Sequence, residues 1–96
     1  MLSLEDIRKK RDEILRIAAE HGARDVRVFG SVVRSEATAG SDLDVLVKLD
    51  EDRCLLDHVA LKQDLEDLLG GEVDVVTEGG LHRLLRERIL AEATPL

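Results

Sequence analysis

The sequence predicts an α/β (α+β) fold in which helices pack on a small mixed three-stranded sheet. Apolar and polar residues alternate in three short runs, whereas apolar residues in three longer runs recur with the period of a helix. Glycines stand at the ends of most of these runs. The chain has 96 residues with no linker or internal repeat, so we expect a single domain over 1–96.

The first expected element is a helix from about Leu4 to about His21. Ser3 and Asp6 match a helix-capping arrangement at its start, and the apolar residues that follow recur at helical spacing. Gly22 supplies a stop signal. One continuous amphipathic helix is therefore expected before the sheet.

The first two expected strands lie on either side of a short turn and a loop. The segment 25–29 (DVRVF) and the segment 42–49 both alternate apolar and polar residues, the second with an apolar Leu46 at one polar position. Between them we expect a helical turn over 31–36 and a loop at 37–41 (ATAGS), which consists mainly of small residues.

The second half of the chain predicts a helix, a strand and a final helix. Leucines at helical spacing over 56–69 end at Gly70, and the strand 72–77 (EVDVVT) follows. The helix is long enough for a right-handed crossover, so strands 42–49 and 72–77 should be parallel. The last helix, after Gly79 and Gly80, has an apolar and a basic side. These are Leu81, Leu84, Leu85, Ile89 and Leu90, and Arg83, Arg86 and Arg88.

Composition limits what the protein can bind. There are 21 acidic and 14 basic residues, and the net charge of -7 disfavours free nucleic acid as a partner. The chain has one Phe, no Trp and no Tyr, so stacking on aromatic side chains cannot hold bases. The acidic excess suits divalent cations or a basic protein surface, although acidity can also serve solubility alone.

Cysteine usage and hydropathy indicate a cytoplasmic protein. Cys54 is the only cysteine, which excludes an intrachain disulfide and a thiolate metal cluster. No segment approaches the roughly 18 apolar residues of a membrane span, and the N-terminus has no apolar signal core.

Three aspartates are candidate metal ligands. Asp42 and Asp44 are two apart on an expected strand, so both side chains point to one face with Cα atoms about 6.6 Å apart. Two such carboxylates repel each other and raise one pKa unless a cation lies between them. Asp74, flanked by Val73 and Val75, is expected on the same face of the neighbouring strand. Three carboxylates suit Mg²⁺, and two such ions serve in-line nucleotidyl displacement.

Gly30 and Ser31 lie where a strand meets a helical turn, a geometry that favours an anion. Glycine permits close approach of a phosphate, and the Ser31 hydroxyl can donate a hydrogen bond. Arg34, one turn later, can add positive charge toward a triphosphate. Each feature alone is weak, because a D-x-D pair often marks only a turn or a solvated strand face. His21, His58 and His82 show no ligand spacing.

Gly30-Ser31, followed after ten residues by Asp42-x-Asp44, resembles the signature of the DNA polymerase beta-like nucleotidyltransferases. Further matches extend the resemblance over nearly the whole chain to the minimal nucleotidyltransferases (MNT). They are Phe29, Arg34, Glu36-Ala37, Ser41, the leucine-rich helix ending in Leu69-Gly70, the strand 73–77 and the ending RERILAEATPL. Two departures are Ser35, where many relatives have glycine, and the lack of a C-terminal aromatic residue.

The resemblance implies a palm-like sheet with Asp42 and Asp44 as shared ligands of two Mg²⁺ ions. Asp74 would be the third catalytic carboxylate and help activate an acceptor hydroxyl. Gly30, Ser31, Arg34 and Ser41 would contact the nucleotide. Attack on the α-phosphate of ATP would release pyrophosphate.

Members of this branch are paired with HEPN-domain toxins as antitoxins, and some adenylylate the toxin. We therefore expect a protein adenylyltransferase that uses Mg²⁺ and ATP, with the toxin supplying most of the acceptor site. The alternative is an antitoxin that neutralises the toxin by occlusion without catalysis. A small-molecule nucleotidyltransferase is disfavoured because no second domain holds the acceptor, although a homo-oligomer could build such a site.

Overall fold

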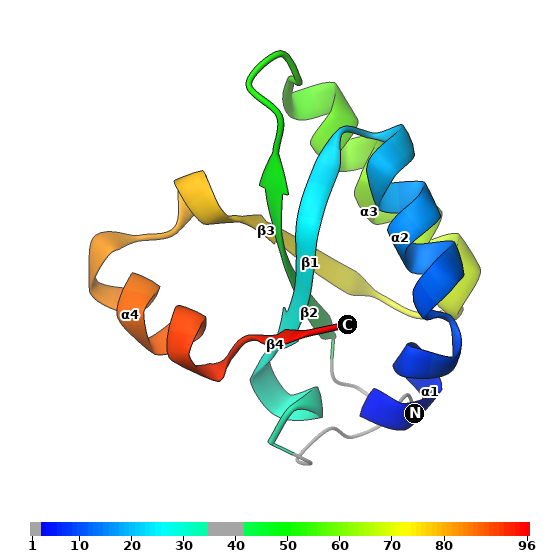
Figure 1. The fold of residues 1–96 in the computed structure, drawn as a ribbon, viewed down its shortest axis with the longest axis horizontal. Helices are drawn as coiled ribbons and strands as arrows, with labels where there is room; N and C mark the ends of the chain where they lie inside the picture. The colour runs from blue at the N-terminus through cyan, green and yellow to red at the C-terminus, as the bar shows by residue number, and fades with distance from the viewer. Residues whose placement is uncertain (1–2, 35–41) are drawn as a thin grey trace.

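The computed structural model describes residues 3–34 and 42–96, and its alternating segments form one mixed sheet in the order β3-β2-β1-β4 (Figure 1). Strand β2 (Leu43–Leu49) is antiparallel to β1 (Ala23–Phe29) and parallel to β3 (Val73–Thr77). The predicted parallel pairing is thus confirmed. The sheet has four strands rather than three, because β4 (Thr94–Pro95) pairs with β1.

Strand β1 begins two residues before the expected start and is irregular in its first half. Asp25 has a φ of 51°, and the pairing with β2 shifts its register between Arg24 and Arg27. The Asp25 carbonyl accepts a hydrogen bond of 3.0 Å from Arg27 Nε. Beyond this bulge the pairing is regular as far as Phe29, so the end of β1 lies in a defined position beside β2.

The expected helix from Leu4 to His21 is divided at Lys10 into α1 (Leu4–Lys9) and α2 (Arg11–Glu20). The predicted cap at Ser3 is confirmed as a capping box with Asp6. At the break, Lys10 Nζ donates a hydrogen bond of 3.1 Å to the Leu68 carbonyl. Ile7 and Ile14, seven residues apart, are both buried, so the apolar stripe continues across the break and gives no sign of it in the sequence.

The main core lies between the sheet and helices α2 and α3 (Leu55–Leu69), which cover one face (Figure 1). Val28, Val47 and Leu61 have no exposed area. Gly70, with a φ of 71°, ends α3 as predicted. No described helix is long and apolar enough to span a membrane.

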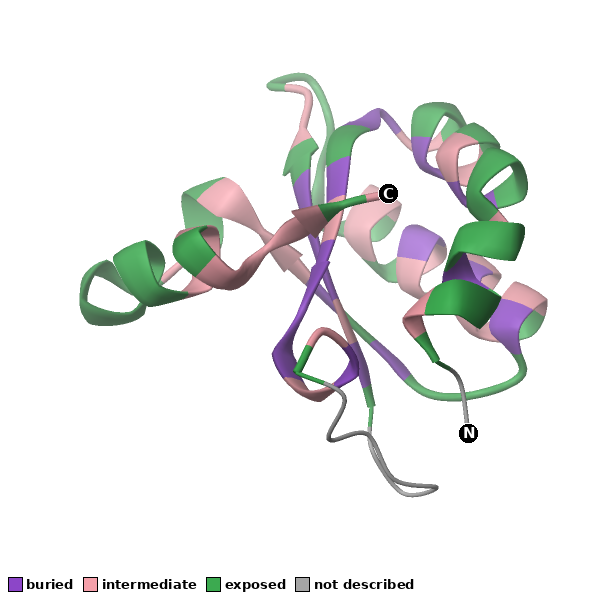
Figure 2. Cartoon of the chain, turned by 60° about the horizontal axis from the view of Figure 1, so that its bottom comes forward, coloured by how far each residue is buried: buried purple, intermediate pink, exposed green. Residues whose placement is uncertain are grey.

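Helix α4 (Arg83–Glu92) lies on the other side of the sheet and has no buried residue (Figures 1 and 2). The expected apolar side of this helix is divided: Ile89 and Leu90 are half-buried, whereas Leu84 is 83% exposed and Leu85 is 50% exposed. Polar contacts connect α4 to the sheet. Arg86 Nη1 donates to the carbonyl of Glu78, in η2 (Glu78–Gly80), and the Glu78 carboxylate lies 2.7 Å from Arg27 of β1.

Candidate active site

The turn after β1 brings the predicted phosphate segment against the predicted metal ligands. Gly30 begins the 3₁₀ turn η1 (Gly30–Val32) with a φ of 80°, a conformation that costs other residues free energy. A Cβ atom on Gly30 would collide with the Asp44 carboxylate. Glycine is therefore needed here both for its backbone conformation and for the close approach of Asp44.

Asp44 and Asp74 are direct partners in the parallel pairing of β2 and β3. Paired residues on adjacent strands direct their side chains to the same face, so the expectation that Asp74 shares a face with Asp44 is met. Asp42, directly before β2, is exposed. Asp74 stands between the buried Val73 and Val75, and its side chain lies on the sheet face opposite α2 and α3 and is exposed.

Burial of the carboxyl group is the main cause that raises the pKa of Asp44 above its ordinary value. The negative charges of Asp74, Asp42 and Glu92 raise it further, and the positive charge of Arg34 opposes them. The ionised site therefore has an unfavourable excess of negative charge, which a bound cation would relieve.

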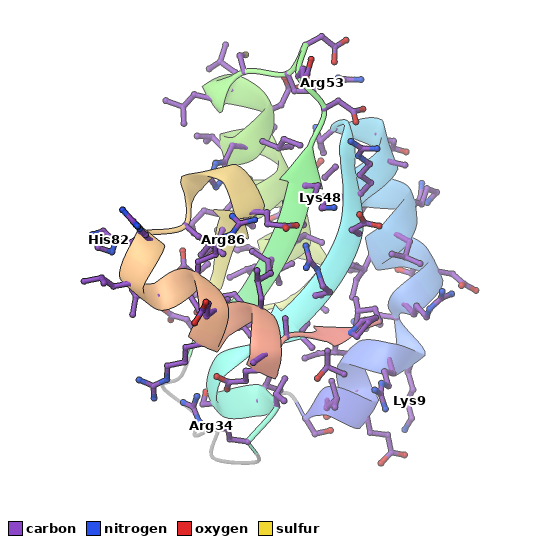
Figure 3. All side chains as sticks on the ribbon, turned by 60° about the vertical axis from the view of Figure 1, so that its left-hand side comes forward. Lys9, Arg34, Lys48, Arg53, His82 and Arg86 are labelled. Atoms are coloured by element: carbon purple, nitrogen blue, oxygen red, sulfur yellow. The ribbon has the colours of Figure 1, made fainter. Side chains whose placement is uncertain are left out.

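Sequence reasoning did not identify Glu92 as part of the site. Its Oε1 atom accepts a hydrogen bond of 3.1 Å from the Gly30 backbone N–H and lies 2.6 Å from Arg34 Nη1 (Figure 3 labels Arg34). Glu92 occurs in the C-terminal segment that carries the family resemblance, but periodicity assigns it only to a helix end. Glu92 contacts Gly30 and Arg34, which precede it by 62 and 58 positions in the sequence. These contacts depend on the pairing of β4 with β1.

The structure does not gather the three predicted metal ligands, Asp42, Asp44 and Asp74, into one group that could hold a metal ion. Within 3–34 and 42–96, no three His, Cys, Asp or Glu side chains are close enough together to hold a metal ion. The carboxylates of Asp44 and Asp74 nevertheless fit Mg²⁺, which is usually bound by one or two carboxylates together with water and substrate phosphates. Of the predicted nucleotide contacts, Gly30, Ser31 and Arg34 lie in and just after η1, and Ser41 is outside the described residues.

Comparison with known proteins gives the family of the chain. The nucleotidyltransferase domain family matches residues 7–96. MJ0435 of Methanocaldococcus jannaschii, provisionally named a protein adenylyltransferase, is 44% identical over 92 residues, which are 96% of each chain. Protein adenylyltransferase MntA of Thermococcus cleftensis is 39% identical over 97 residues, covering 96% of this chain and 94% of the relative.

Solved structures share the fold. One provisionally named minimal nucleotidyltransferase is 55% identical, with a TM-score of 0.89 and coverage of 99% of this chain and 97% of its own. A toxin–antitoxin complex with AMP-PNP matches at a TM-score of 0.75 and 19% identity, over 88% of this chain and 69% of the other. A tri-AMPylated Shewanella oneidensis HEPN toxin in complex with an MNT antitoxin matches at a TM-score of 0.70 and 17% identity, over 92% of this chain and 69% of the other. The last two show likeness of fold alone.

The family match covers nearly the whole chain, and the Gly30 turn and the two paired aspartates occupy neighbouring positions in the sheet. The protein is therefore a nucleotidyltransferase and belongs to the minimal nucleotidyltransferases.

Proposed function

We propose that this protein is an antitoxin that transfers AMP from ATP to a hydroxyl group of a HEPN-domain toxin. The observation that carries the proposal is the in-register pair of Asp44 and Asp74 beside the Gly30 turn. This arrangement offers carboxylates for a cation next to a turn suited to a triphosphate. The similar proteins include protein adenylyltransferases, and their names support transfer of AMP to a protein.

The proposed reaction is a single in-line displacement. The acceptor oxygen attacks the α-phosphorus of ATP, a new phosphate ester bond forms to AMP, and the bond to the bridging oxygen breaks to release pyrophosphate. The hydroxyl proton passes to Asp74, which is exposed and so accessible to an acceptor from another protein. Asp42, Asp44 and Asp74 would hold Mg²⁺, which neutralises phosphate charge when bound. Gly30, Ser31, Arg34 and Ser41 would hold the triphosphate.

Helix α4 is the expected docking surface for the toxin. It flanks the active-site face and ends at Glu92, which contacts the Gly30 turn. Leu84 and Leu85 form an exposed apolar ridge, and Arg83 and Arg88 are exposed beside it. A partner with an apolar patch and an acidic rim would complement this surface, and docking there would bring its hydroxyl group toward Asp44 and Asp74.

A cytoplasmic location belongs to the same proposal. ATP is available there, and Cys54, the one cysteine of the chain, is exposed and free, as suits a reducing compartment.

The test is toxin neutralisation by the Asp42→Asn, Asp44→Asn double variant. We expect cells that express the toxin to be protected by the wild-type protein and not by the variant, and toxin isolated with the wild type to carry the added mass of AMP. A variant that binds the toxin normally and protects as well as the wild type would overturn the catalytic proposal. It would favour neutralisation by occlusion.

A further inference from the structure

Glu92 forms a link between the C-terminal end of α4 and the nucleotide end of the site. One oxygen, Oε1, accepts the hydrogen bond from the Gly30 N–H and also lies 2.6 Å from Arg34 Nη1. The Glu92 side chain is only 19% exposed. The Arg34 side chain is 45% exposed, so the shielded partner of this pair is the carboxylate, which is held in place by its second bond to the Gly30 N–H.

The backbone at Glu92 is fixed to the sheet. The next residues enter β4, where Thr94 pairs with Val28 of β1 and the Leu96 N–H donates to the Val26 carbonyl. Thr94 Oγ1 also donates a hydrogen bond to the Glu92 carbonyl at 3.3 Å. The carboxylate therefore extends from a backbone that is held against β1, the strand that leads directly into Gly30.

The two bonds constrain both groups that are expected to face the triphosphate. The N–H bond fixes the orientation of the first peptide of η1, where the chain has its left-handed turn. A guanidinium carries its five N–H donors in a rigid planar fork, so the bond from Nη1 restricts the directions in which the other donors of Arg34 can point. The negative charge of Glu92 repels the Asp44 carboxylate and so opposes its ionisation. A neutral side chain could hold the turn without this repulsion.

We propose that Glu92 is a positioning residue that holds the Gly30 turn and the Arg34 guanidinium in the geometry that receives the β- and γ-phosphates of the nucleotide. The inference rests on the proposed function, because it assumes a nucleoside triphosphate at this site. The binding measurement below also separates this role from inhibition of nucleotide binding by Glu92. If the Glu92 carboxylate occupied the place of a phosphate, its removal would strengthen nucleotide binding.

The test compares ATP and AMP binding to the wild type, Glu92→Ala, Glu92→Gln and a control, Glu87→Gln, by calorimetric titration with Mg²⁺ present. Glu87 is exposed on the same helix, so the control removes the same charge away from the turn. We expect Glu92→Ala to weaken ATP binding by about tenfold, the factor of a charge-assisted hydrogen bond. AMP binding should stay within about twofold, because AMP lacks the phosphates that this geometry serves.

Glu92→Gln keeps an acceptor for the Gly30 N–H but loses the charge opposite Arg34, so its ATP affinity should lie between those of the wild type and Glu92→Ala. Because glutamine is nearly isosteric with glutamate, this variant tests the inference even if the alanine variant unfolds. Unchanged or tighter ATP binding by Glu92→Gln, or equal weakening of ATP and AMP, would overturn the inference. A wild type that binds no ATP would overturn the proposed function itself.

Discussion

Gly30 is the residue whose replacement separates backbone strain from damage to the site. Both Gly30 and Gly70 have left-handed backbones, with φ values of 80° and 71°. A Cβ on Gly70 would meet nothing within 4 Å, whereas a Cβ on Gly30 would collide with Asp44. The two glycines therefore form a matched pair in which only one contacts the active site.

We expect Gly70→Ala to lower the free energy of unfolding by about 1 kcal/mol and to leave activity unchanged. Gly30→Ala should lower it further and reduce activity by about a hundredfold, because displacement of Asp44 or the turn misplaces the reacting groups. Urea unfolding and AMP transfer assays on both variants measure this. Equal activity of the two variants would show that the contact between Gly30 and Asp44 has no catalytic consequence.

Asp44 makes stability depend on pH in a defined direction. Its pKa is raised in the folded state above the ordinary value of 3.8, so the folded protein binds more protons than the unfolded chain over the interval between these pKa values. Stability is therefore lost as the pH rises through that interval, and the loss is complete above the folded pKa.

Asp44→Asn should accordingly be more stable than the wild type at neutral pH, with the difference vanishing as the pH falls below the ordinary pKa. The exposed turn residue Asp52 supplies a control variant, Asp52→Asn. Urea unfolding of both variants across pH tests the prediction. A neutral-pH stability gain that is the same for Asp52→Asn would contradict the assigned cause, since it would reflect net charge alone.

At the scale of elements, α4 and the start of α3 both expose leucines, but only α4 runs to the active-site turn. Leu55 and Leu56 are 73% and 77% exposed. They follow Arg53, which lies at the opposite end of the molecule from Arg34 (Figure 3). The two helix starts thus provide a test of where the partner docks.

We expect Leu84→Glu, Leu85→Glu to weaken toxin binding by about a hundredfold, as loss of an interface hot spot does, while changing stability by less than about 0.5 kcal/mol. Leu55→Glu, Leu56→Glu should leave toxin binding unchanged. Calorimetry with purified toxin gives both affinities. Weaker binding by the α3 variant, with normal binding by the α4 variant, would move the docking surface to α3.

The elements that were predicted correctly are those with strong local signals. Strand β2 begins one residue after its expected start and ends as expected, because its alternation is broken only at Leu46, and α3 ends where Gly70 adopts a left-handed conformation. The two residues of β4 give no alternation to detect, and the position of α4 depends on polar contacts to Glu78 rather than on apolar burial. Features that depend on distant partners leave no periodic trace in the sequence.

At the scale of the whole molecule, the parallel pairing of β2 and β3 forms the site. Asp44 and Asp74 are 30 positions apart in the sequence, and the crossover through α3 brings them into register. This pairing could be predicted because the crossover helix and the strand alternation both occur in the sequence. The contact of Glu92 with the Gly30 turn could not be predicted, because it requires the C-terminal segment to return to β1, which the sequence pattern does not indicate.

The central claim is tested most directly by ATP labelled at either the α- or the γ-phosphate, incubated with Mg²⁺, this protein and its HEPN-domain partner. We predict that the α label appears on the partner and the γ label leaves in pyrophosphate, and that the Asp42→Asn, Asp44→Asn variant transfers neither. Transfer of the γ label to the partner, or no transfer of the α label where the two proteins bind each other, would contradict the account.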